Sequence, residues 1–364
     1  MAKPDLENIK SWIKLLEAPD IGNAKAVKLA KTLGQPKDFF DSNQLDDIEF
    51  ISQKAKASLR EHNDPKDWNK IAELIEKFEI GFVSVIDDGY PAMLKSVYDP
   101  PPFLFYRGNY DNDLFRRTIA VVGTRKASNY GQISAKRISA KLSQNGFTIV
   151  SGLAYGIDTL SHLAAMENSG KTIAVMGTGV DTIYPPRNRE LAEKILENGL
   201  LISEFIPGRK AEKWNFPTRN RIISGLSLGS FIVEGSKKSG ALLTAKFALD
   251  QNRDIFALPG DINREQSAGP NYLIKLGAKI VCSVDDILEE YDLILTDSKK
   301  SFPKLNPDEE KLYRILIENK PEILFDSLLI KTGMSVGELS TILLTLELKS
   351  IIKKMPGNKI VPVY

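Results

Sequence analysis

Seven short apolar runs in the middle of the chain constrain its fold more than any other feature. They cover residues 118–123, 147–152, 172–177, 200–204, 230–235, 254–259 and 278–283. Continuous apolar runs of this length are typical of strands whose two faces are both covered by helices. Every gap except the last is long enough to hold a crossover helix. The sequence therefore predicts a doubly wound, mostly parallel α/β sheet.

The rest of the chain divides by pattern into separate modules. At 364 residues it exceeds what one hydrophobic core usually supports. Residues 1–80 show helical periodicity and no convincing strand, and residues 81–296 contain the sheet. Residues 297–306 form a polar, proline-containing linker. Residues 307–364 are predicted to form a small helical module that ends in a β-rich tail.

Composition sets limits on partners and location. The net charge of +2 is close to neutral, so any nucleic-acid site must be a local cluster of cations. One cysteine and two histidines argue against a disulfide or a structural zinc site, and Cys282 is expected to be a small buried residue. The polar N-terminus and the absence of an apolar run of about 18 residues predict a cytoplasmic protein without a membrane span.

Ligands of doubly wound sheets bind outside the carboxyl ends of the strands. The segments that follow the predicted strands are rich in cations and aromatic side chains. Positive charges hold phosphates and aromatic faces stack on unpaired bases, so this edge is predicted to bind single-stranded nucleic acid. The alternative is that the lysines are merely solvated. The residues are Arg125, Lys126, Arg209, Lys210, Lys213, Lys237 and Lys238, with Tyr130, Tyr155, Tyr184, Trp214 and Phe216.

A glycine-rich turn at residues 235–240 begins like a phosphate-binding loop of nucleotide hydrolases. Ala241 and Leu242 replace the Lys-Ser/Thr pair that contacts phosphate and magnesium. The turn can still offer backbone N–H groups and a helix N-terminus to an anion. Magnesium-dependent hydrolysis is not expected.

The turn after the first predicted strand lacks the dinucleotide fingerprint. Arg125 stands where that fingerprint requires its second glycine, so a dehydrogenase is not expected. Asp158 and His162 lie four residues apart on a predicted helix. We favour a helix-capping carboxylate and a packed, hydrogen-bonded histidine over a catalytic pair.

Taken in order, the motifs of the sheet region resemble the signatures of the DprA (Smf) family. They are residues 121–125, 151–158, 179–188, 216–225, 238–245, 257–261 and 271–278. The resemblance implies an extended Rossmann-like fold that binds and protects single-stranded DNA and helps load RecA recombinase during natural transformation. It also implies a homodimer. Together with the incomplete nucleotide-binding motifs, it leads us to expect no cofactor and no enzymatic activity.

The resemblance also implies which residues bind nucleic acid. Arg125 follows the first strand, Lys213 and Phe216 precede a helix, and the turn from Lys238 to Gly240 lines the same region. The complete predicted set is Gly123, Thr124, Arg125, Lys213, Phe216, Arg219, Asn220, Lys238, Ser239, Gly240 and Thr244.

The terminal modules resemble family modules less closely. Residues 1–80 are similar to a helix–hairpin–helix or SAM-like module, although Asp20 occupies a hairpin position that favours glycine. Residues 307–364 are similar to a winged-helix module. Its expected recognition helix carries Glu338 and Glu347 and one cation, Lys349, so a protein contact is at least as plausible as DNA binding. Residues 108–296 alone are expected to bind DNA.

Two other functions stay open. A nucleotide phosphoribohydrolase of the same fold class would need a glutamate in the 235–244 turn, where this chain has none. Glu234, which ends a strand, is expected to accept hydrogen bonds from loop N–H groups, or alternatively to pair with Arg125. A protein-interaction scaffold without a working site is the third possibility.

Overall fold

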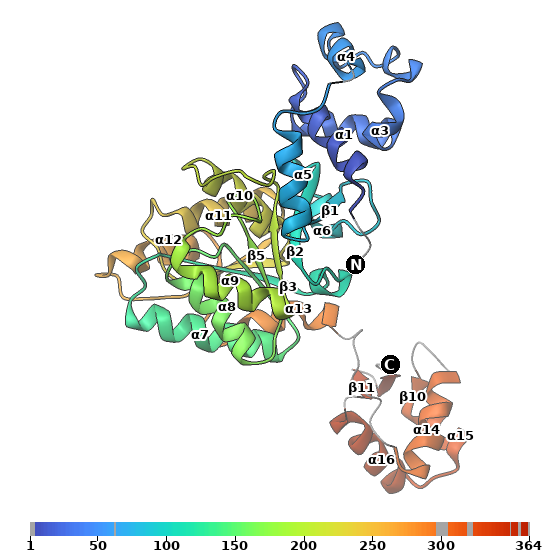
Figure 1. Ribbon diagram of the computed structural model, residues 1–364. Helices are drawn as coiled ribbons and strands as arrows, with labels where there is room; N and C mark the ends of the chain where they lie inside the picture. Colours follow the sequence, from blue (N-terminus) through green and yellow to red (C-terminus); the bar gives the residue numbers. More distant parts are fainter. Residues whose placement is uncertain are drawn as a thin grey trace. The chain divides into compact units, whose positions relative to one another are not determined.

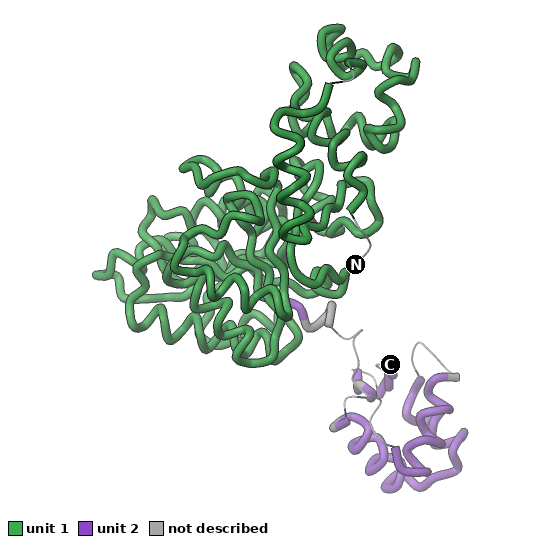
Figure 2. Tube along the Cα trace, in the orientation of Figure 1, with its two compact units in different colours: residues 1–290 green, residues 291–364 purple. Residues whose placement is uncertain are grey.

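The computed structural model describes residues 4–61, 63–295, 305–318, 323–349, 351–355 and 358–362. The chain divides into two compact units, residues 1–290 and 291–364 (Figure 2). The N-terminal helices and the sheet belong to the first unit, so the predicted boundary near residue 80 stays a prediction. Most of the predicted linker, residues 297–304, lies outside the described residues.

The N-terminal segment is helical, as its periodicity predicts. The side chains of Trp12 and Leu29 are fully buried in its core. Asp20 adopts a left-handed φ of 63° between the first two helices, so aspartate takes the conformation that glycine would favour there. The helices are α1 Leu6–Glu17, α2 Asn23–Leu33, α3 Pro36–Phe39, α4 Gln53–Arg60 and α5 Trp68–Lys77, with a 3₁₀ turn at Asn43–Leu45.

A nine-stranded sheet forms the centre of the first unit, in the order β1-β2-β6-β5-β4-β3-β7-β8-β9. The seven strands from β6 to β9 in this order are parallel, which confirms the doubly wound fold. They are β3 Thr118–Val122, β4 Thr148–Ser151, β5 Thr172–Val175, β6 Leu200–Ser203, β7 Gly229–Ile232, β8 Asp254–Ala257 and β9 Lys279–Ile280.

Two antiparallel strands extend the sheet beyond the prediction. β1 (Gly81–Ser84) pairs with β2 (Phe103–Gly108), and β2 pairs with β6. The buried side chains of Phe103, Leu104 and Phe105 pack this edge against the N-terminal helices.

Helices cover both faces of the sheet, with α7–α9 on one side and α10 and α11 on the other (Figure 1). The last gap between strands also contains a helix, α12, so the expectation of a gap too short for one was wrong. The helices are α6 Ala92–Lys95, α7 Asn129–Gln144, α8 Ile157–Glu167, α9 Arg189–Asn198, α10 Asn215–Gly225, α11 Gly240–Asp250, α12 Ala268–Lys275 and α13 Asp285–Leu295, with 3₁₀ turns at Asn112–Phe115, Pro186–Asn188 and Glu265–Ser267.

Cys282 is exposed, which corrects the expectation of a buried residue. The last strand is only two residues long and ends at Ile280, so the apolar run continues into a loop at the sheet edge. Hydrophobic composition alone did not distinguish that loop from a buried strand.

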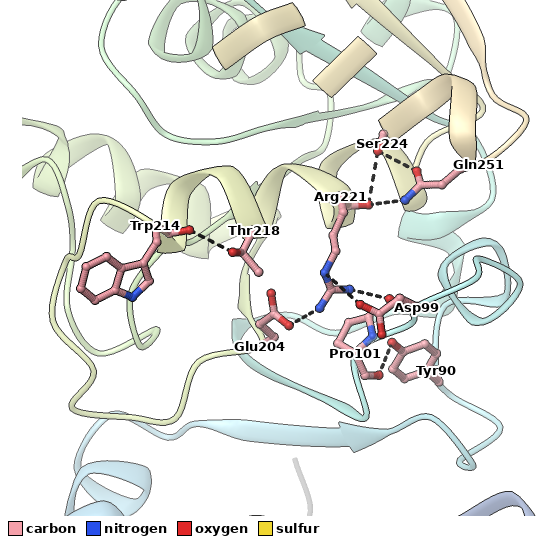
Figure 3. Close-up of polar contacts among 9 residues, drawn as sticks. All are labelled: Tyr90, Asp99, Pro101, Glu204, Trp214, Thr218, Arg221, Ser224 and Gln251. Atoms are coloured by element: carbon pink, nitrogen blue, oxygen red, sulfur yellow. Dashed lines mark hydrogen bonds and ion pairs between the residues drawn. The ribbon is translucent and has the colours of Figure 1, made fainter. Parts of the chain in front are cut away.

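A buried ion pair joins α10 to the residue that follows β6, and a hydrogen bond joins it to the segment before β2 (Figure 3). Arg221 on α10 contacts the Glu204 carboxylate and donates a 2.7 Å hydrogen bond to the Asp99 carbonyl. Burial raises the pKa of Glu204, although the Arg221 charge opposes this. In the segment before β2, the Tyr90 hydroxyl donates a 2.7 Å hydrogen bond to the Pro101 carbonyl. Arg221 therefore anchors α10 both to the end of β6 and to the segment before β2.

The second unit is a small helical module with a three-stranded sheet in the order β10-β12-β11. Its core contains the buried side chains of Leu312, Leu328 and Leu343. The elements are α14 Pro307–Glu318, β10 Ile323–Leu324, α15 Phe325–Thr332, α16 Val336–Leu348, β11 Ile352–Met355 and β12 Lys359–Pro362. Among the described residues, no single helix is long and apolar enough to cross a membrane, and one strongly bent pair, Phe325–Thr332 with Val336–Glu347, meets both criteria together.

Candidate nucleic-acid site

A cavity of about 800 Å³ opens at the carboxyl ends of β3 and β7. These neighbouring strands are followed by crossovers that run in opposite directions along the sheet, which makes this the switch point where doubly wound folds bind ligands. We call it the main cavity. Its walls come from the loops after β3, β4 and β7 and from the first turns of α10 and α11.

All the predicted binding residues except Lys238 line the main cavity. Lys238 is exposed on the turn before α11 and does not reach the lining. Two further residues of the predicted edge, Lys126 and Tyr184, also line it. The sequence missed Glu265 and Gln266, which follow β8 at the same edge of the sheet and could have been included by that rule.

Arg125 is exposed at the mouth of the cavity. Its guanidinium lies 6.0 Å from the centre of the Phe216 ring, within reach of a cation–π contact. It makes no ion pair within the described part of the chain, and the alternative pairing with Glu234 is wrong. The Glu234 carboxylate instead accepts hydrogen bonds from the Ser128 N–H (2.9 Å) and hydroxyl (2.5 Å).

Two aromatic rings line one wall. Phe216 and Tyr184 have their centroids 5.3 Å apart, with ring planes tilted by 41°. A Cβ atom at Gly177 would lie 2.8 Å from the Phe216 ring, so only glycine allows the ring to sit this close to the end of β5. The loop before α10 is held by Asn215, whose amide donates to the Gly177 carbonyl at 3.0 Å.

Arg219 lines the cavity, but its guanidinium is hydrogen-bonded within the protein. Its side chain is buried and donates to the carbonyls of Gly152 (2.7 Å) and Val175. Burial lowers the pKa of Arg219 to about 10, against the opposing effect of Asp158, so the guanidinium stays charged at neutral pH. Arg219 supports the cavity from below, and its predicted direct contact with nucleic acid stays a prediction.

Asp158 and His162 lie with Arg219 in a buried polar cluster. Asp158 accepts hydrogen bonds from the N–H groups of Gly152 (3.1 Å) and Ala154 (3.3 Å) in the loop after β4. The helix α8 begins after Gly156 without a side-chain cap, so the expectation of a helix-capping Asp158 was wrong. His162 Nδ1 lies 2.6 Å from the Thr172 hydroxyl. Burial lowers the pKa of His162 to about 3. The packed, hydrogen-bonded interpretation of this histidine is confirmed.

The N-terminus of α11 forms another wall. Ser239 precedes the helix without a side-chain capping bond, and its hydroxyl is buried without a partner. The first N–H groups of a helix lack intrahelical partners and attract anions. Asn220 and Thr244 both donate to the Gly240 carbonyl, at 3.3 and 3.4 Å, and so fix this turn. An oxyanion in the cavity could therefore be held by backbone donors.

Several cations of the predicted edge lie outside the main cavity. Arg209 pairs with Glu212 at 2.8 Å, and the Lys237 amine lies 5.4 Å from the Tyr272 ring centre. The described residues contain no group of three or more potential metal ligands.

Comparison with known proteins agrees with this architecture. The family model described as DNA recombination-mediator protein A matches residues 81–292, and the DprA winged-helix model matches residues 298–358. DNA processing protein DprA of Streptococcus pneumoniae is 46% identical over 209 residues, which cover 57% of this chain and 73% of that protein. Protein Smf of Escherichia coli is 40% identical over 277 residues, 74% of each chain.

Two solved structures are similar over most of their length. The X-ray structure of S. pneumoniae DprA has a TM-score of 0.66 at 37% identity and covers 79% of this chain and 98% of its own. A structure of Helicobacter pylori DprA, reported for its single-stranded DNA binding mode, has a TM-score of 0.54 at 28% identity. It covers 61% of this chain and 98% of its own. With more than half of its length matched by the family model, the chain belongs to the DprA (Smf) family of DNA-processing proteins.

Proposed function

We propose that the chain binds single-stranded DNA in the main cavity. The observation that carries this proposal is Arg125, an exposed guanidinium that has no carboxylate partner within the described chain and lies against the Phe216 ring. A cation beside an aromatic face offers one group to a phosphate and one to a base. The single-stranded DNA binding described for H. pylori DprA supports the same ligand.

The phosphate would be held on the α11 side of the cavity. Lys213 and Lys126 are exposed at the lining, and the first turn of α11 adds backbone donors. Arginine can hold two phosphate oxygens at once, so Arg125 provides orientation as well as charge. Gly123 and Thr124 bring the backbone to the cavity between these groups.

The base would stack on Phe216 and Tyr184. Both rings line the cavity and Tyr184 is 40% exposed, so a face is open to a ligand. A duplex keeps its bases stacked on each other and cannot offer them to these rings, so the cavity should prefer single strands.

We propose further that the chain catalyses no reaction. The Glu234 carboxylate is occupied by Ser128, and Asp158 is buried against two backbone N–H groups. Glu265 is the carboxylate left at the exposed lining of the described cavity. The rival phosphoribohydrolase would release free base from a nucleoside monophosphate, and loss of that release in Glu265→Gln would support it.

Protection of the strand, loading of RecA and homodimerisation complete the proposal. The family description as a recombination mediator supports the first two. β9 is the last strand of the sheet within the described residues, and this supports a dimer, because an exposed edge strand can pair with another chain. Beside it, Ile280 is 46% and Leu276 65% exposed. Light scattering of wild type and Ile280→Lys would test the dimer.

The deciding experiment is a binding titration of labelled oligo-dT and of a duplex of equal length over a salt series. The proposal expects tighter binding of oligo-dT, with log affinity falling linearly against log salt. Equal affinity for the two forms at matched salt would refute it.

A further inference from the structure

A second depression, of about 560 Å³, adjoins the main cavity and shares Gln266 with it. We call it the side groove. It lies between the first turns of α7 and the loop after β8. Its lining consists of Ser128, Asn129, Tyr130, Ile133, Arg264 and Gln266. Because one side chain borders both hollows, a chain-like ligand can pass from one to the other without leaving the surface.

Arg264 supplies a positive charge to the side groove. It is exposed, and its guanidinium makes no hydrogen bond or ion pair with the part of the chain that the structure describes. The nearby Asp261 carboxylate accepts the Asn263 N–H at 2.9 Å. The backbone of Arg264 is fixed, because its N–H donates to the Asp261 carbonyl at 3.1 Å. A cation on an ordered turn without a carboxylate partner is available to an anion.

Tyr130 supplies an aromatic face. Its hydroxyl donates a 2.7 Å hydrogen bond to the Pro259 carbonyl, which fixes the ring, and the residue is 39% exposed. Ile133, one turn further along α7, is 57% exposed and extends the apolar surface. An aromatic ring that is already fixed loses little entropy when a base stacks on it.

We propose that a single strand held in the main cavity continues across the side groove, with a phosphate on Arg264 and a base on Tyr130. This inference rests on the proposed function. The side groove combines an arginine with an aromatic ring, the same residue types that Arg125 and Phe216 supply to the main cavity. A strand is the ligand that fits, because it repeats phosphate and base along its length and the two hollows border the same side chain, Gln266.

The test compares two lengths of oligo-dT: a short one of about 4 nucleotides, which fills the main cavity, and one of about 16, the range of site sizes for single-strand modules. Arg264→Ala should weaken binding of the long oligonucleotide about tenfold, the effect of one charge-assisted hydrogen bond. Its salt slope should fall by about 0.7 for the lost phosphate contact. Binding of the short oligonucleotide should not change.

Matched variants separate stacking from structural effects. Tyr130→Ala should weaken binding of the long oligonucleotide about tenfold. Tyr130→Phe keeps the ring but loses the bond to Pro259, so it should bind between Tyr130→Ala and wild type, closer to wild type. Arg116→Ala removes the same charge at the amino end of β3, opposite the cavity edge, and should leave both lengths unaffected. Thermal melting of each variant verifies that it is folded.

The outcomes distinguish this inference from the proposed function. If wild type binds neither oligonucleotide, the proposed function fails. If wild type binds both and folded Arg264→Ala keeps full affinity for the long one, the main cavity stands and the side-groove path is wrong. Equal weakening of both lengths by Arg264→Ala also overturns the path, because Arg264 would then act on the main cavity.

Discussion

The mouth and the base of the main cavity use the same kind of side chain in different ways. At the mouth, Arg125 and Lys213 are exposed and have no carboxylate partner in the described structure. At the base, Arg219 is buried with Asp158 and gives its hydrogen bonds to backbone carbonyls. Arg125 and Lys213 leave their donors to a ligand, whereas Arg219 holds α10 to the ends of β4 and β5. The following predictions test this division.

The largest effect is expected at the base. Arg219→Ala removes the charge that compensates Asp158 and leaves buried carbonyls without donors, so it should lower the free energy of unfolding by about 3 kcal/mol or more. Urea denaturation measures this. Adding Asp158→Asn to the same chain should recover part of the loss, because the two charges are coupled. An unchanged unfolding midpoint in Arg219→Ala would remove the distinction between base and mouth.

At the mouth, substitution should affect binding and not stability. Arg125→Ala should weaken the binding of oligo-dT by about 1.5–3 kcal/mol, roughly ten- to a hundredfold in affinity. Arg125→Lys should recover only part, because lysine cannot grip phosphate with two parallel donors. Fluorescence anisotropy over a salt series measures both affinity and slope. If folded Arg125→Ala keeps the affinity and slope of wild type, the ligand lies elsewhere.

The buried cluster should also respond to pH. The pKa of His162 is about 3 in the folded chain against 6.5 ordinarily, so the unfolded chain binds the proton more readily. The stability that depends on neutral His162 is therefore complete above pH 6.5 and is lost as the pH falls toward 3. At pH 5 this loss is about 2 kcal/mol. The His162→Gln variant should not show this loss of stability at low pH. Identical profiles of stability against pH in wild type and variant would contradict the lowered pKa of His162.

The smallest effect is expected from removing the second unit. Residues 1–290 should bind oligo-dT within about twofold of the full chain, a free-energy difference of under 0.5 kcal/mol. We use residues 1–290 for this test in place of the predicted span 108–296. A chain that starts at residue 108 would lack β1, most of β2 and the Asp99 carbonyl that Arg221 contacts. If folded residues 1–290 bind oligo-dT more than tenfold more weakly than the full chain, the second unit takes a direct part in binding.

The parallel sheet was predictable because strands covered on both faces are continuous apolar runs. β2 was not predicted although residues 103–105 are apolar, because it is antiparallel and lies outside the repeat of strand and helix that indicates a parallel sheet. The apolar run at residues 278–283 predicts a strand, but β9 ends at Ile280, because an apolar run at a sheet edge has the same composition as a buried one.

The position of the site was also predictable, since the strand order places carboxyl ends together. The roles of Arg125 and Arg219 were not separable, because burial of Arg219 depends on Gly152, 67 residues earlier in the chain. Whether a lysine lines the cavity, as Lys213 does, or misses it, as Lys238 does, depends on loop geometry that composition does not specify.

The pairing of β3 with β7 has a consequence for how the site forms during folding. Ile119 lies opposite Gly229, so the two strands that frame the cavity are separated by more than a hundred residues of chain. Contacts of such long sequence separation are slow to form, because the intervening loop must be closed first. Strands β3 to β6 are complete by Ser203. The binding site is therefore a late product of synthesis, absent from any nascent chain that has not reached β7.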